Sequence, residues 1–306
     1  MTAGIVIVTY RCREEALACL DSIARHVPEL LPSTVVVDNA SGDGTAAAVR
    51  QRYPQVRLLE HRRNLGFAAA ANAGIGVLGA CEAVLLLNPD AALADAGLRD
   101  AVAFANEHED IGVLGLRVEN PDGSVQLSCR RFPSHRTALF NRHSLITRLL
   151  PGNRWSRDYL MSDWDHGEVR DVDWVSGAAM LIHRRALERV GVLDPGYFFS
   201  IEDVDYCRRV WDAGLRVVYW PHARVVHHIG RSSGKAPVRA MVAHHAGMWR
   251  YYQKHQRGGW WLDALTVAGI GARLGVHLAA HALRRAQARW QRGSGGFMGA
   301  EVGRTP

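Results

Sequence analysis

The chain has 306 residues, of which 48% are hydrophobic and 22% charged, so it has an ordinary globular composition and enough length to bury a large core. Its five scattered cysteines include no C-x-x-C pair, which argues against a structural zinc site and suits a reducing compartment. The N-terminus lacks a signal-peptide pattern. No stretch reaches 18 apolar residues without a charge, so a membrane-spanning helix is not expected.

The net charge of +7 is unevenly distributed along the chain. Residues 231–292 contain eleven Lys and Arg residues and one acidic residue, Asp263, which leaves the rest of the chain slightly acidic. A basic C-terminal region on such a body indicates an anionic partner, which could be a membrane surface, a diphosphate or nucleic acid. Nucleic acid is disfavoured because the region has no recognition motif and no aromatic residues interleaved on a sheet.

Strands and helices alternate over the first 90 residues. β-Branched and apolar runs predict strands at 4–9, 34–37, 56–59 and 83–87, and helical spacing predicts helices at 14–26, 45–52 and 67–78. This alternation predicts an α/β fold with a mostly parallel, Rossmann-like central sheet flanked by helices. Ligands bind such sheets at the carboxyl ends of the strands.

The second half of the chain is less regular. It predicts a strand at 111–118, a long loop at 149–168, strands at 169–175 and 178–183, a helix at 204–213, and two strands at 216–220 and 224–228. Helices are expected from Arg239 onward. The expected organisation is a catalytic domain at 1–233, a basic helical extension at 234–292 and a disordered tail at 293–306.

Polar residues follow several of the predicted strands: Thr9-Tyr10, Asp38-Asn39 and Asn88-Pro89-Asp90. No G-x-G-x-x-G follows Thr9 and no P-loop motif occurs, so a nicotinamide enzyme or P-loop enzyme is disfavoured. Asp38 could accept a hydrogen bond from a pyrimidine N–H, or it could simply start a turn. The small residues at 64–72 would let a ligand approach the backbone, although helix packing by alanine would also explain them.

Two sequence positions could hold a divalent cation. A carboxylate at Asp90 could bridge Mg²⁺ or Mn²⁺ to a diphosphate, although Asn-Pro-Asp is also common in turns. His227, in the pair His227-His228, could supply an imidazole to the same metal. A buried histidine pair without supporting residues is more often structural.

The stretch 199–205 places three carboxylates, Glu202, Asp203 and Asp205, around a helix start. Free N–H groups and the helix dipole favour the ionised form there, which suits a general base. Ser200 with Asp203 three residues later also fits a capping box, and a cap and a catalytic acid are compatible. Glu202 and Asp203 would both lie in the first turn of this helix, so both are candidates for the base.

Seven stretches match, in order, motifs of one enzyme family: IVIVTYR (5–11), VVVDNAS (35–41), NLGFAAAANAGI (64–75), LLLNPDA (85–91), DWVSGAAMLIHRRAL (173–187), GVLDPGYFFSIEDVDYCRRVWDAGLRVVYWP (191–221) and VVHHIGRSS (225–233). Together they cover most of residues 4–233. The chain resembles the family 2 inverting glycosyltransferases of GT-A fold, in particular their rhamnosyltransferase-like branch. Its tail looks like that of actinobacterial transferases that add rhamnose to a lipid-linked N-acetylglucosamine.

The resemblance implies roles for individual residues. Asp203 and Glu202 would form the catalytic acid pair, with Asp203 as the base and Glu202 as its neighbour or substitute, and Asp205 would be structural. Trp174 and Gly177 would shape the sugar and acceptor site. Asp90 would be the metal-binding acid of the family's D-x-D element, whose first acid is Asn88 here, and His227 would lie near the metal. The nucleotide sugar would contact Thr9, Tyr10, Arg11, Asp38, Asn64, Gly66, Asn72, Asn88 and Asp90.

The resemblance also implies an activity. The expected reaction is inverting transfer of a sugar, with L-rhamnose as first choice, from a dTDP- or UDP-sugar to a glycan or polyprenyl-diphosphate-linked acceptor in cell-envelope synthesis. Mg²⁺ or Mn²⁺ would be the cofactor. The alternative is a non-catalytic nucleotide- or glycan-binding protein on the same scaffold.

The expected location is the cytoplasm, with possible attachment to the inner face of the membrane. Trp260, Trp261 and a basic rim favour a helix lying in a membrane interface. Packing of the C-terminal helices on the catalytic domain or in a homodimer is the other interpretation.

Overall fold

The structure is a computed structural model that describes residues 3–134, 153–228 and 236–295, with side chains described up to residue 288. The chain divides into two compact units, residues 1–235 and 236–306, and each is described by itself. The domain boundary predicted after residue 233 falls in 229–235, outside the described residues.

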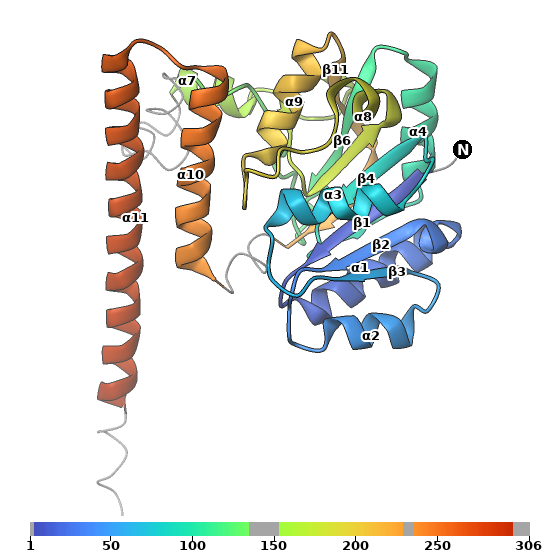
Figure 1. Ribbon diagram of the computed structural model, residues 1–306, viewed down its shortest axis with the longest axis horizontal. Helices are drawn as coiled ribbons and strands as arrows, with labels where there is room; N and C mark the ends of the chain where they lie inside the picture. Colours follow the sequence, from blue (N-terminus) through green and yellow to red (C-terminus); the bar gives the residue numbers. More distant parts are fainter. Residues whose placement is uncertain (1–2, 135–152, 229–235, 296–306) are drawn as a thin grey trace, which may run out of the picture. The chain divides into compact units, whose positions relative to one another are not determined.

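The first unit is a mixed β-sheet with helices on both faces (Figure 1). The strand order is β3-β2-β1-β4-β10-β6-β11-β5, and β8 pairs with β11. The strands are β1 (Ala3–Thr9), β2 (Thr34–Asp38), β3 (Arg57–Glu60), β4 (Ala83–Leu87), β5 (Ala91–Leu93), β6 (Ile111–Glu119), β8 (Arg170–Asp171), β10 (Ala179–His183) and β11 (Arg216–His227). A separate small sheet pairs β7 (Cys129–Arg130) with β9 (Trp174–Val175).

Helices cover both faces because successive residues of the central strands are buried on opposite sides. On one face, Ile5 and Ile7 belong to the core that also includes buried residues of α1 and α4. On the other, α3 approaches closely because Gly74 has no side chain; a Cβ there would lie 2.6 Å from a methyl group of Val6. The helices are α1 (Arg13–His26), a 3₁₀ turn at Pro28–Ser33, α2 (Thr45–Arg52), α3 (Phe67–Val77), α4 (Leu98–Glu107), α7 (Arg154–Leu160), α8 (Arg184–Val190) and α9 (Glu202–Asp212).

The predicted α/β class is confirmed, and the sheet combines two kinds of pairing. Strands β3, β2, β1 and β4 are parallel, as the alternating pattern predicts. Strand β10 runs antiparallel to β4 and β6, and β5 runs antiparallel to β11.

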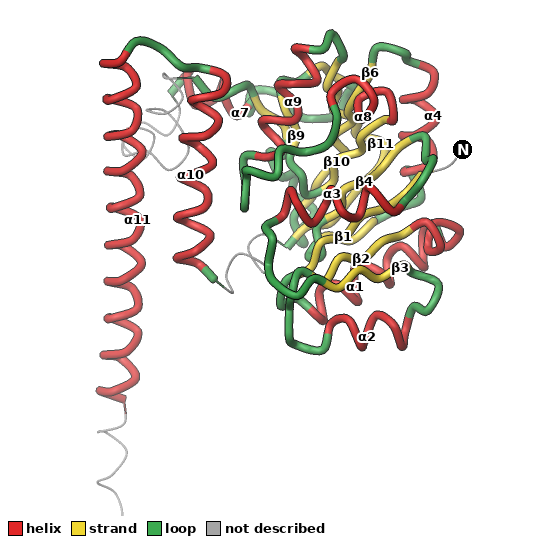
Figure 2. The backbone as a smooth tube through the Cα atoms, viewed as in Figure 1, coloured by secondary structure: helices red, strands yellow, loops and turns green. Residues whose placement is uncertain are grey.

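Two sequence predictions about the second half are wrong. The long loop predicted at 149–168 contains α7, shown as a short helix in Figure 2, and Asn153 caps it by accepting a hydrogen bond from the Ser156 N–H at 2.8 Å. The two strands predicted at 216–220 and 224–228 form one strand, β11. Its register against β6 shifts between Trp220 and Arg224, so a bulge accommodates Pro221 within the strand.

The second unit contains two helices, α10 (Pro237–His255) and α11 (Trp260–Gly295), which pack against each other. The Tyr252 hydroxyl donates a hydrogen bond to Asp263 across the turn that joins them. Of the predicted disordered tail, residues 293–295 belong to α11 and residues 296–306 lie outside the described residues.

Helix α11 has an extensive apolar surface. From Trp260 to Ala288 it is long and apolar enough to cross a membrane, judged by length and composition alone. This differs from the sequence expectation, which counted only runs free of charge and stopped at Asp263 and Arg273. Five of its large apolar side chains are more than half exposed: Trp260, Trp261, Leu265, Val276 and Leu283.

Candidate active site

The carboxyl ends of β1, β2 and β4 meet at one edge of the sheet. Thr9 pairs with Asp38 in the register of β1 and β2, and Ile7 pairs with Leu87 at the end of β4. Thr9 is fully buried, and its hydroxyl has no hydrogen-bond partner among the described residues. Asp38 Oδ1 accepts a hydrogen bond from the Ser41 N–H at 2.9 Å, so it starts a turn as the alternative interpretation proposed.

Asn39 connects the ends of these strands to the loop before α3. Its N–H donates to the Thr9 carbonyl at 2.9 Å, and its Nδ2 donates to Asn64 Oδ1 and to the Gly66 carbonyl, both at 3.1 Å. Its Oδ1 accepts from the Leu65 N–H at 2.9 Å. Asn39 is only 2% exposed. It therefore holds the 64–66 loop in place, a role that the sequence analysis missed.

Gly66 brings this loop against the segment that precedes the acid pair. Its φ of 86° and ψ of 170° lie in a region that is essentially restricted to glycine. A Cβ at this position would lie 2.5 Å from the Phe198 carbonyl oxygen and 2.8 Å from Phe198 Cα. The Phe67 N–H donates to that same carbonyl at 2.8 Å. The predicted donor loop and the predicted catalytic segment are thus in direct backbone contact.

Asp203 is held at the start of α9 by two backbone donors. The Gly177 N–H donates to Oδ2 at 3.0 Å and the Val204 N–H donates to Oδ1 at 2.9 Å. The residue after Gly177 also contacts the turn that follows β4, because the Ala178 carbonyl accepts a hydrogen bond from the Asn88 N–H at 3.0 Å. A short series of hydrogen bonds therefore links Asp203 to the end of β4.

The neighbouring Glu202 has a different environment. It is 6% exposed, and its Oε2 has no hydrogen-bond partner among the described residues. Burial, together with the adjacent Asp203, raises the pKa of Glu202 well above its usual range. Burial also raises the pKa of Asp203, but the two N–H donors and the nearby Arg130 oppose that rise. The two N–H donors stabilise the carboxylate form of Asp203, so Asp203 is the member of the pair that ionises first.

The residues before the pair adopt an unusual backbone conformation. Ser200 (φ 66°) and Ile201 (φ 74°) are both left-handed, which is strained for a β-branched residue such as Ile201. Ile201 is the N-cap of α9 and provides no side-chain cap, so the prediction that Ser200 caps the helix is wrong. The carboxylates of the first turn are therefore the acidic groups nearest the free N–H groups of the helix.

Asp205 has the structural role that the sequence analysis assigned to it. It is fully buried and forms an ion pair with Arg209 at 2.9 Å, and it accepts a hydrogen bond from the Tyr197 hydroxyl at 3.2 Å. The Tyr197 hydroxyl ties α9 to the segment before it, and Arg209, which lies within α9, does the same by donating to the Val190 and Val192 carbonyls at 3.0 Å.

Asp90 and His227 lie together at the same edge. The antiparallel pairing of β5 with β11 aligns Ala91 with His227, and the His228 N–H donates to the Asp90 carbonyl at 3.0 Å. His227 Nε2 lies 3.3 Å from Asp90 Oδ1. The structure therefore brings together the two residues predicted to share a metal. Half-buried Asn88 lies on the turn between β4 and β5.

Trp174 is positioned by the small sheet. Its indole N–H donates to the Arg131 carbonyl at 2.8 Å, and the Arg130 guanidinium lies over its ring, 5.2 Å from the centroid. Trp174 pairs with Arg130 in the register of β7 and β9, three residues before Gly177. Trp174 and Gly177 thus lie on the segment that supports Asp203, and Arg130 is a nearby cation that the sequence analysis missed.

Of three other predicted nucleotide contacts, Tyr10 and Arg11 are accessible to solvent, whereas Asn72 is hydrogen-bonded to the backbone. Half-buried Tyr10 lies next to exposed Arg11, whose guanidinium is 5.2 Å from the Tyr10 ring centroid. Asn72 Nδ2 donates to the Leu193 carbonyl at 2.7 Å, and its Oδ1 accepts from the Leu193 N–H at 3.0 Å. This geometry gives Asn72 a structural role and does not support the prediction that it binds nucleotide.

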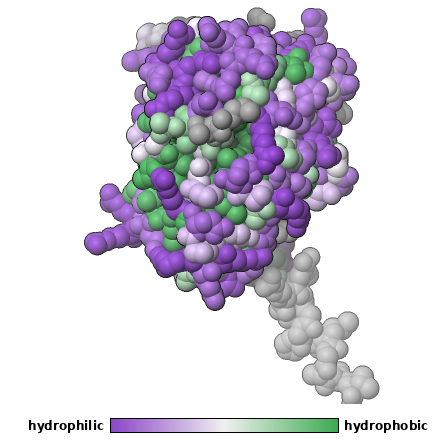
Figure 3. Space-filling view, turned by 90° about the vertical axis from the view of Figure 1, so that its right-hand side faces the viewer, coloured by the Kyte–Doolittle hydropathy of each residue, from purple (hydrophilic) through white to green (hydrophobic). Residues whose placement is uncertain are grey.

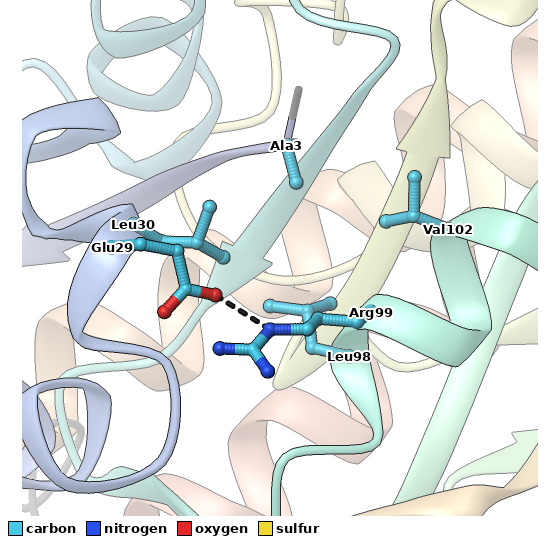
Figure 4. A pocket seen from close by; sticks show the side chains of 6 residues that line it. All are labelled: Ala3, Glu29, Leu30, Leu98, Arg99 and Val102. Carbon is cyan, nitrogen blue, oxygen red and sulfur yellow. Dashed lines mark hydrogen bonds and ion pairs between the residues drawn. The ribbon is translucent and has the colours of Figure 1, made fainter. Parts of the chain in front are cut away.

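A separate surface hollow lies away from these residues. It contains Ala3, at the amino end of β1, whereas the candidate site includes Thr9 at the carboxyl end. An ion pair between Glu29 and Arg99 spans 2.7 Å across it (Figure 4). The hollow is lined by Ala3, Glu29, Leu30, Leu98, Arg99 and Val102.

Figure 3 shows one face of the molecule, on which an area of hydrophobic residues is surrounded by hydrophilic ones.

The sheet order and the polar carboxyl edge of its parallel strands correspond to the GT-A fold. Two solved structures share this fold with TM-scores of 0.55. They are the mannosyltransferase PcManGT from Pyrobaculum calidifontis in complex with GDP-Man and Mn²⁺, 18% identical over 92% of this chain and 79% of that one, and GalNAc-T7 with UDP, GalNAc and Mn²⁺, 14% identical over 74% and 43%.

The family model of glycosyl transferase family 2 matches residues 4–163, and the chain belongs to this family. It is 34% identical to the N-acetylglucosaminyl-diphospho-decaprenol L-rhamnosyltransferase of Mycobacterium tuberculosis over 93% of this chain and 95% of the relative. It is 26% identical to the low-salt glycan biosynthesis hexosyltransferase Agl10 of Haloferax volcanii over 67% and 60% of the two chains. These findings confirm the family and the class of enzyme expected from the sequence motifs.

Proposed function

We propose that this glycosyltransferase moves L-rhamnose, with inversion, from a dTDP- or UDP-linked donor to a hydroxyl of a polyprenyl-diphosphate-linked glycan. The observation that carries the proposal is the hydrogen-bonded connection from Asp203 through Gly177 and Ala178 to the strand end beside Asp90. It joins a candidate base to a candidate diphosphate site. The similarity to the mycobacterial rhamnosyltransferase supports the choice of sugar and acceptor.

In this proposal Asp203 is the general base. Its carboxylate accepts the proton of the acceptor hydroxyl while that oxygen bonds to the anomeric carbon and the bond from this carbon to the diphosphate oxygen breaks. The nucleoside diphosphate leaves with the electron pair. Because the reaction is one displacement, no side chain forms a covalent intermediate. Glu202 stays protonated and can donate a hydrogen bond.

Asp90 and His227 would hold a divalent cation, Mg²⁺ or Mn²⁺. An oxygen and an imidazole nitrogen facing each other at 3.3 Å are a suitable donor set. Among the described residues, no group of three or more His, Cys, Asp or Glu side chains could hold a metal, so a diphosphate and water would complete the coordination. When bound, the cation would neutralise charge that develops on the leaving diphosphate.

Thermal-shift measurements with UDP-, dTDP- and GDP-sugars, with and without Mn²⁺, test the donor assignment. A ligand that binds only the folded state at about 100 times its Kd stabilises it by about 2.7 kcal/mol. We expect the largest rise in Tm with dTDP-rhamnose or the corresponding UDP-sugar plus Mn²⁺. A larger shift with a GDP-sugar would contradict the proposed donor.

The non-catalytic alternative is favoured by one observation, the amide of Asn88 in place of an acid. Transfer from a radiolabelled donor to a lipid-linked acceptor distinguishes the two functions. A binding protein would give a thermal shift without transferring label.

We also propose that the second unit binds the surface of an anionic membrane. Helix α11 exposes Trp260 (84%) and Leu265 (64%) on a segment that carries Arg284 and Arg285 at its other end. Apolar side chains with tryptophans and a basic rim suit a helix lying in the interface, and Arg273 in its middle disfavours a spanning position. Such attachment would place the enzyme where a lipid-linked acceptor resides.

Replacing Leu265 and Val276 together by Glu should lower the partition coefficient to anionic vesicles by about tenfold or more. Each change removes an apolar side chain whose full burial stabilises by about 1.5–3 kcal/mol. Sedimentation with phosphatidylglycerol vesicles measures the effect. The control with the same charge change is Gln51→Glu with Gln55→Glu, two exposed positions of the first unit. Equal partition of both double variants would contradict a lipid-facing α11.

A further inference from the structure

The side-chain amide of Gln126 contacts two groups of His227, its backbone carbonyl and its ring nitrogen Nδ1. Its Nε2 donates to the His227 carbonyl at 2.6 Å and to the Glu119 carbonyl at 3.4 Å. Its Oε1 lies 3.1 Å from His227 Nδ1. None of the seven stretches that match the family includes this residue.

These contacts determine the protonation of the imidazole ring. A carbonyl oxygen has no hydrogen to donate, so the amide nitrogen must face the two carbonyls and Oε1 must face the ring. An amide oxygen only accepts hydrogen bonds, so Nδ1 must carry the hydrogen. In the neutral ring, Nε2 then has the lone pair, and this is the atom that lies 3.3 Å from Asp90 Oδ1.

Two acceptors at that distance, in a site where the Asp90 side chain is 3% and the His227 side chain 12% exposed, repel each other unless a cation or proton lies between them. A histidine that binds a metal through one ring nitrogen commonly donates the N–H of the other nitrogen to a polar group, which fixes its tautomer. Gln126 Oε1 is placed to accept such a hydrogen bond from His227 Nδ1. Its own backbone is held at the end of β6, where its N–H donates to the Val118 carbonyl at 2.9 Å and its carbonyl accepts from Ser128 at 2.7 Å.

We propose that Gln126 is a positioning residue that fixes the ring orientation and the Nδ1–H tautomer of His227, so that Nε2 presents its lone pair to a divalent cation shared with Asp90. This inference rests on the proposed metal site. Asp90 and His227 are the two ligands proposed from the described part of the chain, so loss of the correct orientation of one of them removes half of their joint contribution to the site.

The test combines tautomer and metal measurements on the full chain. In ¹⁵N-histidine-labelled wild-type protein above pH 8, two-bond ¹H–¹⁵N spectra should show His227 protonated on Nδ1, and Gln126→Leu should give a mixture of tautomers. Mn²⁺ affinity with UDP or dTDP present, measured by electron paramagnetic resonance, should fall about 10–100-fold in Gln126→Leu. Gln126→Met, which keeps the side-chain length, provides a second variant if Gln126→Leu folds poorly.

Asn120→Ala is the matched control. Asn120 lies in the same turn, and its side chain donates to the Ser124 hydroxyl instead of to His227. The control should keep both the wild-type tautomer and the wild-type Mn²⁺ affinity. An unchanged tautomer with unchanged Mn²⁺ affinity in Gln126→Leu would overturn this inference alone. If the wild type bound no Mn²⁺ with either nucleotide, the proposed metal site would fail and this inference with it.

Discussion

Asp203→Asn is expected to lower kcat by about 10²–10⁴-fold, the usual contribution of a general base, and to leave the donor Kd nearly unchanged. The amide keeps one of the two oxygens that accept hydrogen bonds from the Gly177 and Val204 N–H groups, but it cannot take a proton from the acceptor hydroxyl. Steady-state kinetics and donor titration separate the two effects. Retention of more than about a tenth of wild-type turnover would exclude Asp203 as the base.

Glu202→Gln is the matched control for this variant. If Glu202 keeps its proton, glutamine is a close replacement and most of the turnover should remain. If instead Glu202→Gln loses turnover as Asp203→Asn does, the assignment of the base to Asp203 alone is wrong. The two variants differ by one position and make the same chemical change.

The pH dependence follows from the raised pKa values. Since the base acts when ionised, kcat/KM should fall as the pH falls through a value above the ordinary range of an aspartate.

The stability of the protein should also depend on pH. A carboxyl whose pKa is raised by folding favours the native state below its unfolded pKa, and this contribution is lost as the pH rises through the folded pKa. The glutamine of Glu202→Gln cannot ionise, so at a pH above the folded pKa of Glu202 the free energy of unfolding of this variant should exceed that of the wild type.

Gly66→Ala should have the second large effect. The positive φ costs an alanine about 1–3 kcal/mol, and the new Cβ would lie 2.5 Å from the Phe198 carbonyl oxygen, which adds about 1–3 kcal/mol of overpacking. Because the clash is with the backbone of Phe198, relieving it must move the segment that leads to Asp203, the proposed base. We expect a lower free energy of unfolding in urea and a fall in kcat.

Gly191→Ala isolates the steric part of this prediction. Gly191 has φ 83° and ψ −159°, nearly the backbone conformation of Gly66, but nothing lies within 4 Å of a Cβ built there. It should lose only the backbone contribution and keep its turnover. If both variants lost equal stability and activity, contact with Phe198 would not be what makes Gly66 necessary.

The sequence predicts the first half of the fold well because its signals are local. Buried β-branched runs and helical spacing define β1, β2, β4 and the helices between them within a residue or two. The signal for α4 was present but overlooked, since Leu98, Ala101, Val102 and Ala105 form one buried face. Pro221 suggested a break in β11 because proline lacks an N–H, but the bulge depends on pairing with β6, which the local sequence does not reveal.

The site was predictable to the extent that motifs mark it. The proximity of Asp90 to His227 follows from β5 pairing with β11, and residue spacing alone could not show it. Asn39 and Gln126 were not identified because each acts through residues distant in sequence: Asn39 holds a loop about 25 residues later, and Gln126 holds a histidine 101 residues later. The strain at Ser200 and Ile201 has no signal in residue type, since neither is a glycine.

The backbone contact between Gly66 and Phe198 has a consequence for engineering the donor preference. Substitutions that reshape the 64–66 loop for another sugar would also shift the segment that leads to Asp203, so their effects on binding and on turnover would be non-additive. A library that varies only the donor loop would select mainly for tolerance of this contact. A library that varies the 64–66 loop and the segment around Phe198 together could change specificity while keeping Asp203, the proposed base, in position.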